Sequence, residues 1–436
     1  MKLICIIFLT AAFILPQNKA EDVKTFTLNN GMQVIVLEDN SIPNAAMYLF
    51  WKVGSRNEYP GITGISHFFE HMMFNGAKKY GPKQFDIVME ANGGANNAYT
   101  TNNVTVYTNW FPKSALELIF DLEADRIANL NFDDDMIESE RGVILSERST
   151  SLENSNETLL IQEVTAAAFK AHPYSWPVIG WESDIKNWTK NDLQNYFKTY
   201  YAPNNCVVVI SGDVKFDEVK NLSKKYLEPI PAGIPPRQIH TIEPEQNGEK
   251  RLAVKKEVTT PHLLAVYHVP QTNSAESYAL DLLSSILSTG KTSRLYNSLV
   301  DKKQLATDVW TYYGESFDPY LFMIYSVCNE GITPAQLEEA VYAELEKIAN
   351  EGITENELQK VKNQKVMEFY KTMETISGKA NQLGTYHLYF GDYKKLFNAP
   401  SEYQKVSNEE IQNVVKKYFT KSNRTVGILS SEGELK

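Results

Sequence analysis

The residues best suited to chemistry in this sequence lie close together, between positions 67 and 71. His67 and His71 are four residues apart, and Glu70 directly precedes the second histidine. On an α-helix such a pair shares one face, so both imidazoles can reach a common metal ion. Catalytic zinc takes three protein ligands and one water, and Glu70 is close enough to remove a proton from that water. The HxxEH order holds the chemical parts of the HExxH zinc motif in reverse.

The same segment also has the pattern of an ordinary amphipathic helix. Its apolar side chains form one stripe: Ile65, Phe68, Phe69, Met72 and Met73. This stripe accounts for a helix packed on a core. It does not account for two histidines and a glutamate on the other face in a chain with only seven histidines. We therefore expect one helix that both packs on the core and binds a metal.

A second acidic helix is expected at residues 133–152, where three aspartates suit the positive end of a helix dipole. Glu140 and Glu147 are seven residues apart, which is two turns, so they share a face. Glutamates so spaced often form only a solvated face, but apolar residues at 143–145 lie between them. Glu147 can complete a His2Glu zinc site, and Glu140 can orient one of the histidines or tune the metal.

The segments around these helices predict a mixture of strands and helices. Strands are expected near 24–38, 45–53 and 96–111, and further helices near 63–75, 83–91, 114–129, 156–169 and 189–201. The strands and helices do not alternate regularly, as they would in a doubly wound parallel sheet. The predicted fold class is therefore α+β, with mixed and mostly antiparallel sheets that carry packed helices.

The chain also reads as two copies of one domain. Residues 229–248 hold five prolines, which predicts an extended linker because proline cannot continue a helix or a central strand. Residues 195–212 resemble residues 413–430 at a shift of 218. This repeat at the end of each half indicates duplication. We predict an N-terminal zinc-binding domain at 21–228 and a homologous C-terminal domain at 249–436.

The first twenty residues have the layout of a secretory signal peptide. Lys2 is followed by an apolar run from Leu3 to Leu15 and by a polar stretch that ends at Ala20. This predicts cleavage of residues 1–20 and a periplasmic or secreted protein; an uncleaved N-terminal anchor is the alternative. No later segment is long and apolar enough to span a bilayer.

The sequence disfavours two other classes of function, nucleic-acid binding and nucleotide binding. The net charge of −11 and the absence of a basic stripe disfavour nucleic-acid binding. The stretch STGKTSR at 288–294 ends like a phosphate-binding loop, but Ser285 stands where the first glycine is needed.

Two cysteines, Cys206 and Cys328, remain after removal of the signal peptide. We expect both to be buried packing residues, although one disulfide between them is possible.

The stretch GSRNEYPGITGISHFFEHMMFNG resembles the signature of the pitrilysin/insulinase-type zinc peptidases, the inverzincins. It resembles in particular the group of roughly 50 kDa proteins that includes mitochondrial processing peptidase. In that family the third ligand is a glutamate 76 residues after the second histidine, the position of Glu147, and a second glutamate falls on Glu140. Further similar stretches are NAYT at 97–100, PYSWPVIGWESDI at 173–185 and YYAPNNCVVVISGDV at 200–214.

This resemblance implies a zinc endopeptidase that cleaves peptides or unfolded segments. It implies one Zn²⁺ per chain, held by His67, His71 and Glu147, with Glu70 as general base. Such a chain is half of a clamshell, which two chains or two chain halves close around a chamber. The extended peptide would pair with an edge strand, for which NNAYT is the candidate. Asn97 matches a family position that contacts substrate, unless it is simply a turn asparagine.

One expected feature is missing from the sequence. The family uses an arginine and a tyrosine, seven residues apart, to grip the substrate and stabilise the oxyanion. The similarity places Val300 and Thr307 at those positions, and neither side chain can replace them. Arg294 and Tyr296 lie nearby, but in a segment where the family's arginine is structural. We therefore expect a heterodimer in which a homologous, zinc-free partner supplies the pair; a homodimer is the alternative.

Two other functions fit the same fold. One is a non-catalytic scaffold subunit, as in the core proteins of respiratory complexes, but such subunits lose zinc ligands that this chain keeps. The other is a maturation protease dedicated to one peptide precursor, which differs in substrate and not in chemistry. The sequence favours the general zinc endopeptidase.

Overall fold

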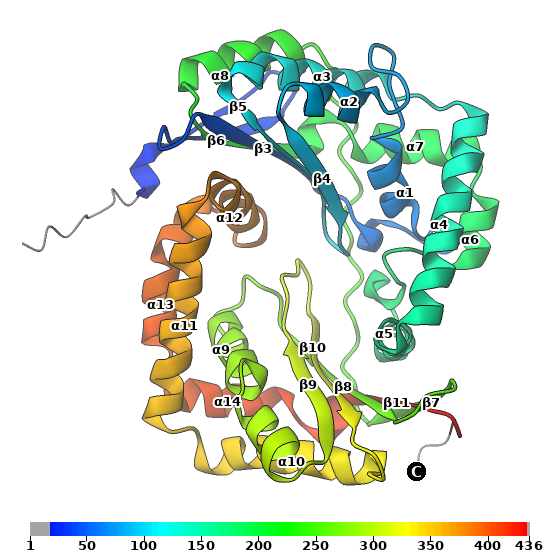
Figure 1. Cartoon of the computed structure of the whole chain (residues 1–436), viewed down its shortest axis with the longest axis vertical. Coiled ribbons are helices and arrows are strands. Elements are labelled where there is room, and N and C mark those ends of the chain that lie inside the picture. The colour runs from blue at the N-terminus through cyan, green and yellow to red at the C-terminus, as the bar shows by residue number, and fades with distance from the viewer. Residues whose placement is uncertain (1–17, 434–436) are drawn as a thin grey trace, which may run out of the picture.

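Two β-sheets, one in each half of the chain, organise the molecule (Figure 1). The computed structural model describes residues 18–433. The predicted signal peptide therefore lies almost entirely outside the described residues. Among residues 18–433, no helix is both long and apolar enough to cross a membrane.

The first sheet has six strands in the order β1-β2-β6-β3-β5-β4. Their bounds are β1 Val23–Thr27, β2 Gln33–Glu38, β3 Asn44–Trp51, β4 Ala95–Thr100, β5 Thr105–Pro112 and β6 Cys206–Gly212. Only β2 and β6 run parallel; the other neighbours are antiparallel. The segment expected as strand at 24–38 is a hairpin, because Gly31, at φ +87°, turns the chain between β1 and β2. Strand β4 forms one edge of the sheet.

The second sheet repeats this arrangement without the outermost strand. Its order is β7-β11-β8-β10-β9, and again one pair, β7 with β11, is parallel. The bounds are β7 Lys250–Lys255, β8 His262–Val269, β9 Ala306–Tyr312, β10 Tyr320–Cys328 and β11 Arg424–Ser430. The predicted mixed, mostly antiparallel sheets are thus confirmed in both halves.

The repeat seen in the sequence is a repeat of structure. Helix α7 (Lys190–Tyr200) and β6 are matched, 218 residues later, by α14 (Asn408–Tyr418) and β11. The Asn205 side chain donates to the carbonyl of Tyr200, and that of Asn423 donates to the carbonyl of Tyr418, both at 2.8 Å. Each bond closes the turn between helix and strand, so the identical asparagines have identical tasks. The prediction of two homologous α+β domains is confirmed.

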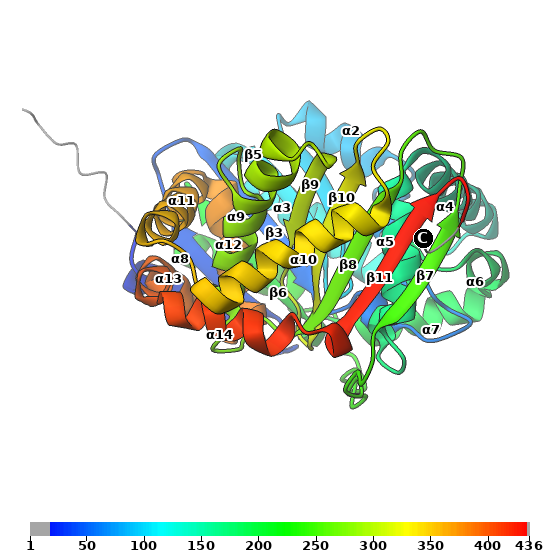
Figure 2. The same cartoon turned by 90° about the horizontal axis from the view of Figure 1, so that it is seen from below.

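Helices cover the outer face of each sheet. The first sheet carries α1 (Ile65–Met72), α3 (Leu116–Asn129), α7 and α8 (Phe216–Leu222), which enclose a large apolar core. The second carries α9 (Ser277–Ser288), α10 (Pro334–Glu351) and α14 around a core of its own. Figure 2 shows α10 and α14 lying across this outer face. Three shorter helices are α2 Gln84–Ala91, α6 Glu182–Asn187 and α13 Ala399–Lys405.

The inner faces are covered by an exchange of helices between the halves (Figure 1). Helix α4 (Asp134–Asn154) leads into α5 (Asn156–Ala168), which packs on the second sheet through Leu160 and Val164. Helix α11 (Glu355–Glu374) leads into α12 (Ile376–Tyr389), which packs on the first sheet through Ala380 and Leu383. Each half therefore supplies part of the other half's core.

Both exchanged contacts depend on a glycine. A Cβ at Gly384 of α12 would lie 2.1 Å from the Phe50 ring of β3. A Cβ at Gly427 of β11 would lie 2.2 Å from Val164 of α5. Helix and sheet approach too closely at these points for any larger residue.

Neither a helix nor a strand lies between Leu227 and Lys250, the stretch that contains the inferred linker. This stretch is nevertheless held in place by hydrogen bonds to the N-terminal half. The Glu243 carboxylate accepts three backbone N–H groups, from residues 170–172, at 2.7–2.9 Å. Cys206 and Cys328 are both buried and free, as expected for packing residues.

Candidate metal centre

Helix α1 begins at a tightly constrained turn. Its N-cap Gly64 has φ +86°, and a Cβ there would lie 2.4 Å from the carbonyl of Ile179. The buried Glu58 carboxylate accepts the N–H groups of Gly64 at 2.7 Å and Ser66 at 2.8 Å. A carboxylate in this place satisfies orphan donors of the first turn. The start and direction of the helix are thereby fixed.

The apolar stripe of α1 is core, as the sequence predicted. Ile65, Phe68, Phe69 and Met72 are completely buried, and Met73 nearly so. The Tyr107 hydroxyl donates to the carbonyl of Phe69 at 2.9 Å. Because this face is held against the sheet, the opposite face, with both histidines, is directed toward α4.

Helix α4 is fixed by a stripe of its own, in which Ile137, Arg141, Ile144 and Arg148 are buried. Arg141 donates to the carbonyl of Trp188 at 2.8 Å, and Arg148 donates to Gln162 at 3.1 Å. Glu140 and Glu147 each directly precede one of these arginines, so they lie at the margin of the buried stripe. The shared face expected from their spacing brings them to α1.

The three predicted ligands converge. One donor atom from each of His67, His71 and Glu147 lies within 4.8 Å of the other two. The Glu147 carboxylate is 3.8 Å from Nε2 of His67 and 3.5 Å from Nε2 of His71. Ligands at zinc bond lengths in a tetrahedron are about 3.4 Å apart. The residues therefore fit a zinc ion with only small side-chain movement.

Glu140 contacts a histidine, as predicted. Its Oε1 is 2.6 Å from Nδ1 of His71, and its Oε2 accepts the Asn75 side-chain amide at 2.5 Å. A carboxylate on Nδ1 makes that nitrogen the donor and leaves Nε2 with its lone pair toward Glu147. Nδ1 of His67 is buried and has no partner among the described residues, so packing alone orients that ring.

Charge and burial set the protonation of the site. Burial lowers the pKa of His67 to about 4, so its imidazole is neutral, as ligation requires. Burial also disfavours protonated His71, but its bond to Glu140 raises the pKa above the usual value. Burial raises the pKa of Glu70. A hydrogen bond with Thr100 and the nearby charge of His71 lower it again in part, so that it stays above the usual value. A general base profits from such a raised pKa, because it then holds a proton more readily.

The opening of the site lies at Glu147. Its side chain is 46% exposed, whereas those of His67 and His71 are 12% and 24% exposed. The α4 face that carries Glu147 is an open surface, on which the neighbouring Gly142 and Ser146 are small and exposed. A fourth ligand can therefore approach from this side.

Asn97 lies outside this cluster. It is exposed in the edge strand β4, where its carbonyl accepts the Thr108 hydroxyl at 3.2 Å. Strand β4 packs against α1, and its last residue, Thr100, faces Glu70. The structure thus places the NNAYT segment at a sheet edge beside the site, but shows no contact between Asn97 and the three ligands.

Sequence reasoning missed two supporting residues. Asn75 follows His71 by four residues, so the same helical spacing that links the histidines pointed to it. Glu58 precedes the helix by several residues and closes its first turn through a loop. No local spacing rule marks a carboxylate at that distance as a cap.

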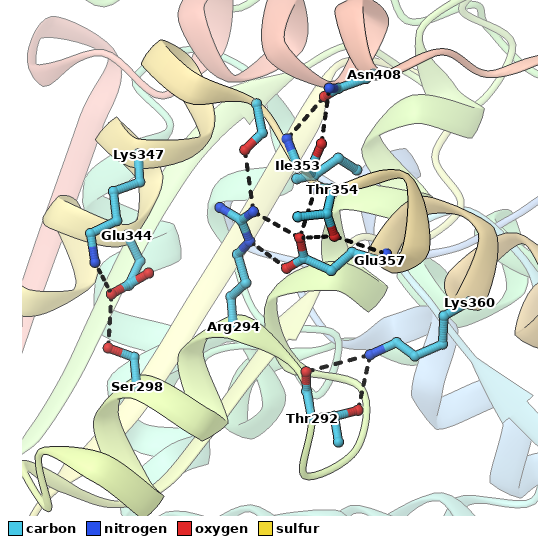
Figure 3. A network of polar contacts seen from close by, with 11 residues as sticks. Thr292, Arg294, Ser298, Glu344, Lys347, Ile353, Thr354, Glu357, Lys360 and Asn408 are labelled. Atoms are coloured by element: carbon cyan, nitrogen blue, oxygen red, sulfur yellow. Dashed lines mark hydrogen bonds and ion pairs between the residues drawn. The ribbon is translucent and has the colours of Figure 1, made fainter.

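The two positions where the family has its substrate-binding arginine and tyrosine carry other residues in this chain. Val300 packs against the second core, and Thr307 is exposed in β9. Arg294 is engaged elsewhere: it donates to Glu357 at 2.7 and 3.0 Å and to the carbonyl of Gly352 at 3.2 Å (Figure 3). Because this pair ties the start of α11 to the chain beyond α9, Arg294 is structural, as its place in the sequence indicated.

Comparison with protein families divides the chain into two matches. The family described as "Insulinase (Peptidase family M16)" matches residues 34–181. The family described as "Peptidase M16 inactive domain" matches residues 187–365, which include the proline-rich stretch. The metal cluster lies wholly in the first match.

Known proteins resemble the chain over nearly its whole length. It is 31% identical to the zinc protease PqqE of Helicobacter pylori, over 93% of this chain and 92% of that protein. A solved protease structure from Helicobacter pylori superposes with a TM-score of 0.90 at 30% identity, covering 94% of this chain and 99% of the other. The periplasmic protease PqqL of Escherichia coli shares the fold at 19% identity and a TM-score of 0.76; this chain covers 48% of it and is itself 96% covered. With its ligand cluster, its duplicated domains and this full-length similarity, the chain belongs to peptidase family M16, the insulinase family.

Proposed function

We propose that this protein is a zinc-dependent endopeptidase that hydrolyses peptides or unfolded segments. The observation that carries the proposal is the convergence of His67, His71 and Glu147 within 4.8 Å. The relative PqqE is named a zinc protease, which supports the same metal and the same class of reaction.

In the proposed reaction, each residue of the site has one task. His67, His71 and Glu147 hold one Zn²⁺, which when bound lowers the pKa of a water and polarises the scissile carbonyl. Glu70 takes the proton of that water and later gives it to the leaving amine. Glu140 keeps Nδ1 of His71 protonated and the ring directed toward the metal position.

The substrate is proposed to add a strand to the first sheet. Strand β4 is an edge strand, and its residues alternate between exposed and half-buried. An extended peptide pairs with such an edge through main-chain hydrogen bonds, without regard to sequence. Asn97, exposed on β4, is proposed to bind the substrate main chain through its side-chain amide.

A homologous partner is proposed to complete the active site. Val300 and Thr307 cannot stabilise an oxyanion, and Arg294 is held by Glu357. This chain covers about half of PqqL, so the same fold occurs there as part of a longer chain. We infer a heterodimer with a zinc-free subunit that supplies arginine and tyrosine; a homodimer is the alternative.

The predicted signal peptide remains the basis for localisation. PqqL is described as a periplasmic protease, which supports a periplasmic or secreted location for this chain. Removal of residues 1–20 would leave Cys206 and Cys328 as the only cysteines.

Glu70→Gln tests the enzymatic proposal against the scaffold alternative. The native protein, with any partner that co-purifies, should bind one zinc per chain and cleave an unstructured peptide. The Glu70→Gln variant should keep the zinc and lose about a thousandfold or more in kcat. Retained peptidase activity in that variant would disprove the mechanism. A native protein that binds no zinc and cleaves nothing would favour the scaffold.

A further inference from the structure

The C-terminal domain contains its own counterpart of the helix pair that holds the metal ligands. Helix α9 is the first helix after β8, just as α1 is the first helix after β3. Helix α11 is the long helix before the exchanged α12, just as α4 precedes α5. Helices α9 and α11 pack together as α1 and α4 do. The duplication therefore produced a second site position with different residues.

An ion cluster occupies this second position. Nζ of Lys365, on α11, lies 2.8 Å from Asp281 of α9 and 3.8 Å from Glu368. The Tyr403 hydroxyl donates to the other oxygen of Asp281 at 2.6 Å. Burial works against the charge on Lys365, but Asp281 and Glu368 raise its pKa above the usual value. Where the first domain gathers metal ligands, the second holds an internal ammonium group.

A cavity of about 280 Å³ adjoins the cluster. Its ionisable lining consists of Asp281, Glu315 and Glu368 against Lys365, so carboxyl groups are in excess, and burial raises the pKa of one of them, Glu315. The other walls are largely aromatic, including Tyr278, Tyr313 and Tyr386. The Tyr313 hydroxyl is buried and has no hydrogen-bond partner among the described residues. An unpaired buried hydroxyl is costly, and a polar ligand group in the cavity would relieve that cost.

The cavity lies near the proposed substrate strand. Tyr99 of β4 donates to Asn381 of α12 at 3.2 Å, and the next residue, Gln382, lines the cavity. Asn103, which closely follows β4, donates to the carbonyl of Glu315, another lining residue, at 3.3 Å. The end of β4 is therefore linked to the cavity wall through α12 and the Glu315 loop.

We propose that this cavity binds the cationic side chain, lysine or arginine, of a peptide bound to the protein. Excess carboxylate favours a cation, and the faces of the surrounding rings attract it further. A glutamate side chain would be repelled by Glu315 and Glu368. The inference rests on the proposed function, because it assigns part of the substrate's sequence preference to the C-terminal domain.

Binding to zinc-loaded Glu70→Gln protein tests the proposal without turnover. The probes are eight-residue fluorescent peptides in which a single lysine is moved one position at a time along an otherwise neutral sequence. Matched peptides carry norleucine or glutamate instead. We expect one lysine position to bind at least tenfold more tightly than its norleucine match, and the glutamate match to bind weakest.

Two substitutions connect that preference to the cavity. Glu368→Gln should reduce the lysine preference to less than threefold, and Lys365→Met should increase it. Glu339→Gln removes an exposed carboxylate from α10 and should leave it unchanged. The proposal is overturned if no lysine position is preferred, or if the preference survives both Glu368→Gln and Asp281→Asn. A native protein that shows the preference but never cleaves would refute the proposed function and leave the cavity's assignment intact.

Discussion

Oε1 of Glu140 lies 2.6 Å from Nδ1 of His71, and this one contact decides which nitrogen of that histidine faces the metal position. Asn75 holds the second oxygen of the same carboxylate, so Glu140 cannot turn toward the metal itself. We therefore propose different tasks for the two glutamates two turns apart on α4: Glu147 to bind the metal and Glu140 to orient His71. The first predictions follow from this division.

Glu140→Gln should weaken zinc binding by about 10- to 100-fold, because a neutral amide is a poorer acceptor for Nδ1–H of His71. The dissociation constant can be measured by competition with a chromophoric chelator. Glu153→Gln is the control, since Glu153 is exposed on the same helix and its carboxylate accepts a hydrogen bond only from Ser149 among the described residues. Equal zinc affinity in both variants would show that Glu140 has no orienting role.

His67→Ala, His71→Ala and Glu147→Gln should each reduce bound zinc from one equivalent to below about one tenth, since two protein ligands hold zinc poorly. Metal content after dialysis, measured by mass spectrometry, checks this. Glu70→Gln should retain the full equivalent. Native protein from which the metal has been removed should regain activity on addition of zinc. Stoichiometric zinc in the Glu147→Gln variant would exclude Glu147 as a ligand.

Asn97→Ala should lower kcat/KM for peptide cleavage by about tenfold, chiefly through KM, because a hydrogen bond to substrate is lost. Zinc content and thermal stability should not change, because Asn97 is exposed and touches none of the ligands. Steady-state kinetics with one peptide substrate decide the matter. Unchanged kinetics would mean that Asn97 is only a surface residue of β4.

Gly384→Ala should destabilise the protein by about 1–3 kcal/mol, although alanine favours helices, because the new methyl group meets the Phe50 ring. Gly142→Ala is the matched helical control. Nothing lies within 4 Å of a Cβ there, so this variant should gain about 0.5–1 kcal/mol. Thermal melts of both variants give the comparison, and a stabilised Gly384→Ala protein would contradict the close packing of α12 on β3.

Arg294→Gln should destabilise the protein at neutral pH by about 2 kcal/mol, because a partly buried ion pair loses one partner. Arg294 holds the pKa of Glu357 at about 2, below its unfolded value near 4.5. This contribution is complete above pH 4.5 and is lost as the pH falls toward 2. The difference in stability between native and variant protein should therefore shrink over that range.

Urea unfolding at a series of pH values measures this difference. Lys360→Gln serves as control, because Lys360 contacts only Thr292 at the surface of the same network (Figure 3). Its effect should stay below about 0.5 kcal/mol. A difference between native and Arg294→Gln protein that stays constant from pH 5 to pH 2 would refute the assigned ion pair.

Much of this architecture could be predicted because its signals are visible in the sequence itself, as helical spacing and as an internal repeat. The spacing of His67 and His71 is one helical turn, and that of Glu140 and Glu147 is two, so each pair could be assigned to one face. The shift of 218 residues between Asn205 and Asn423 identified the duplication, and the structure places both in the same turn. Helical spacing and internal repetition can both be assigned from the sequence before the packing of the chain is known.

Contacts chosen by tertiary packing could not be predicted in this way. The amphipathic pattern of α5 shows that it packs on something, but not that its sheet belongs to the other half. The cluster of Asp281 and Lys365 joins residues 84 positions apart, and neither has a spacing that marks it. Likewise, Glu58 caps α1 only because the intervening loop folds back.

The exchange of α5 and α12 has a consequence for the integrity of the molecule. Each sheet borrows its inner covering from the opposite half, and Lys250 of β7 donates to the last carbonyls of α5 at 2.8 and 2.9 Å. A protease that nicked the proline-rich stretch would therefore leave two fragments clasped together, each burying a segment of the other. Once the chain has folded, the two halves would therefore stay together without their covalent connection. If the two fragments were expressed separately, each would have one helix without its sheet and one sheet face without its covering helix.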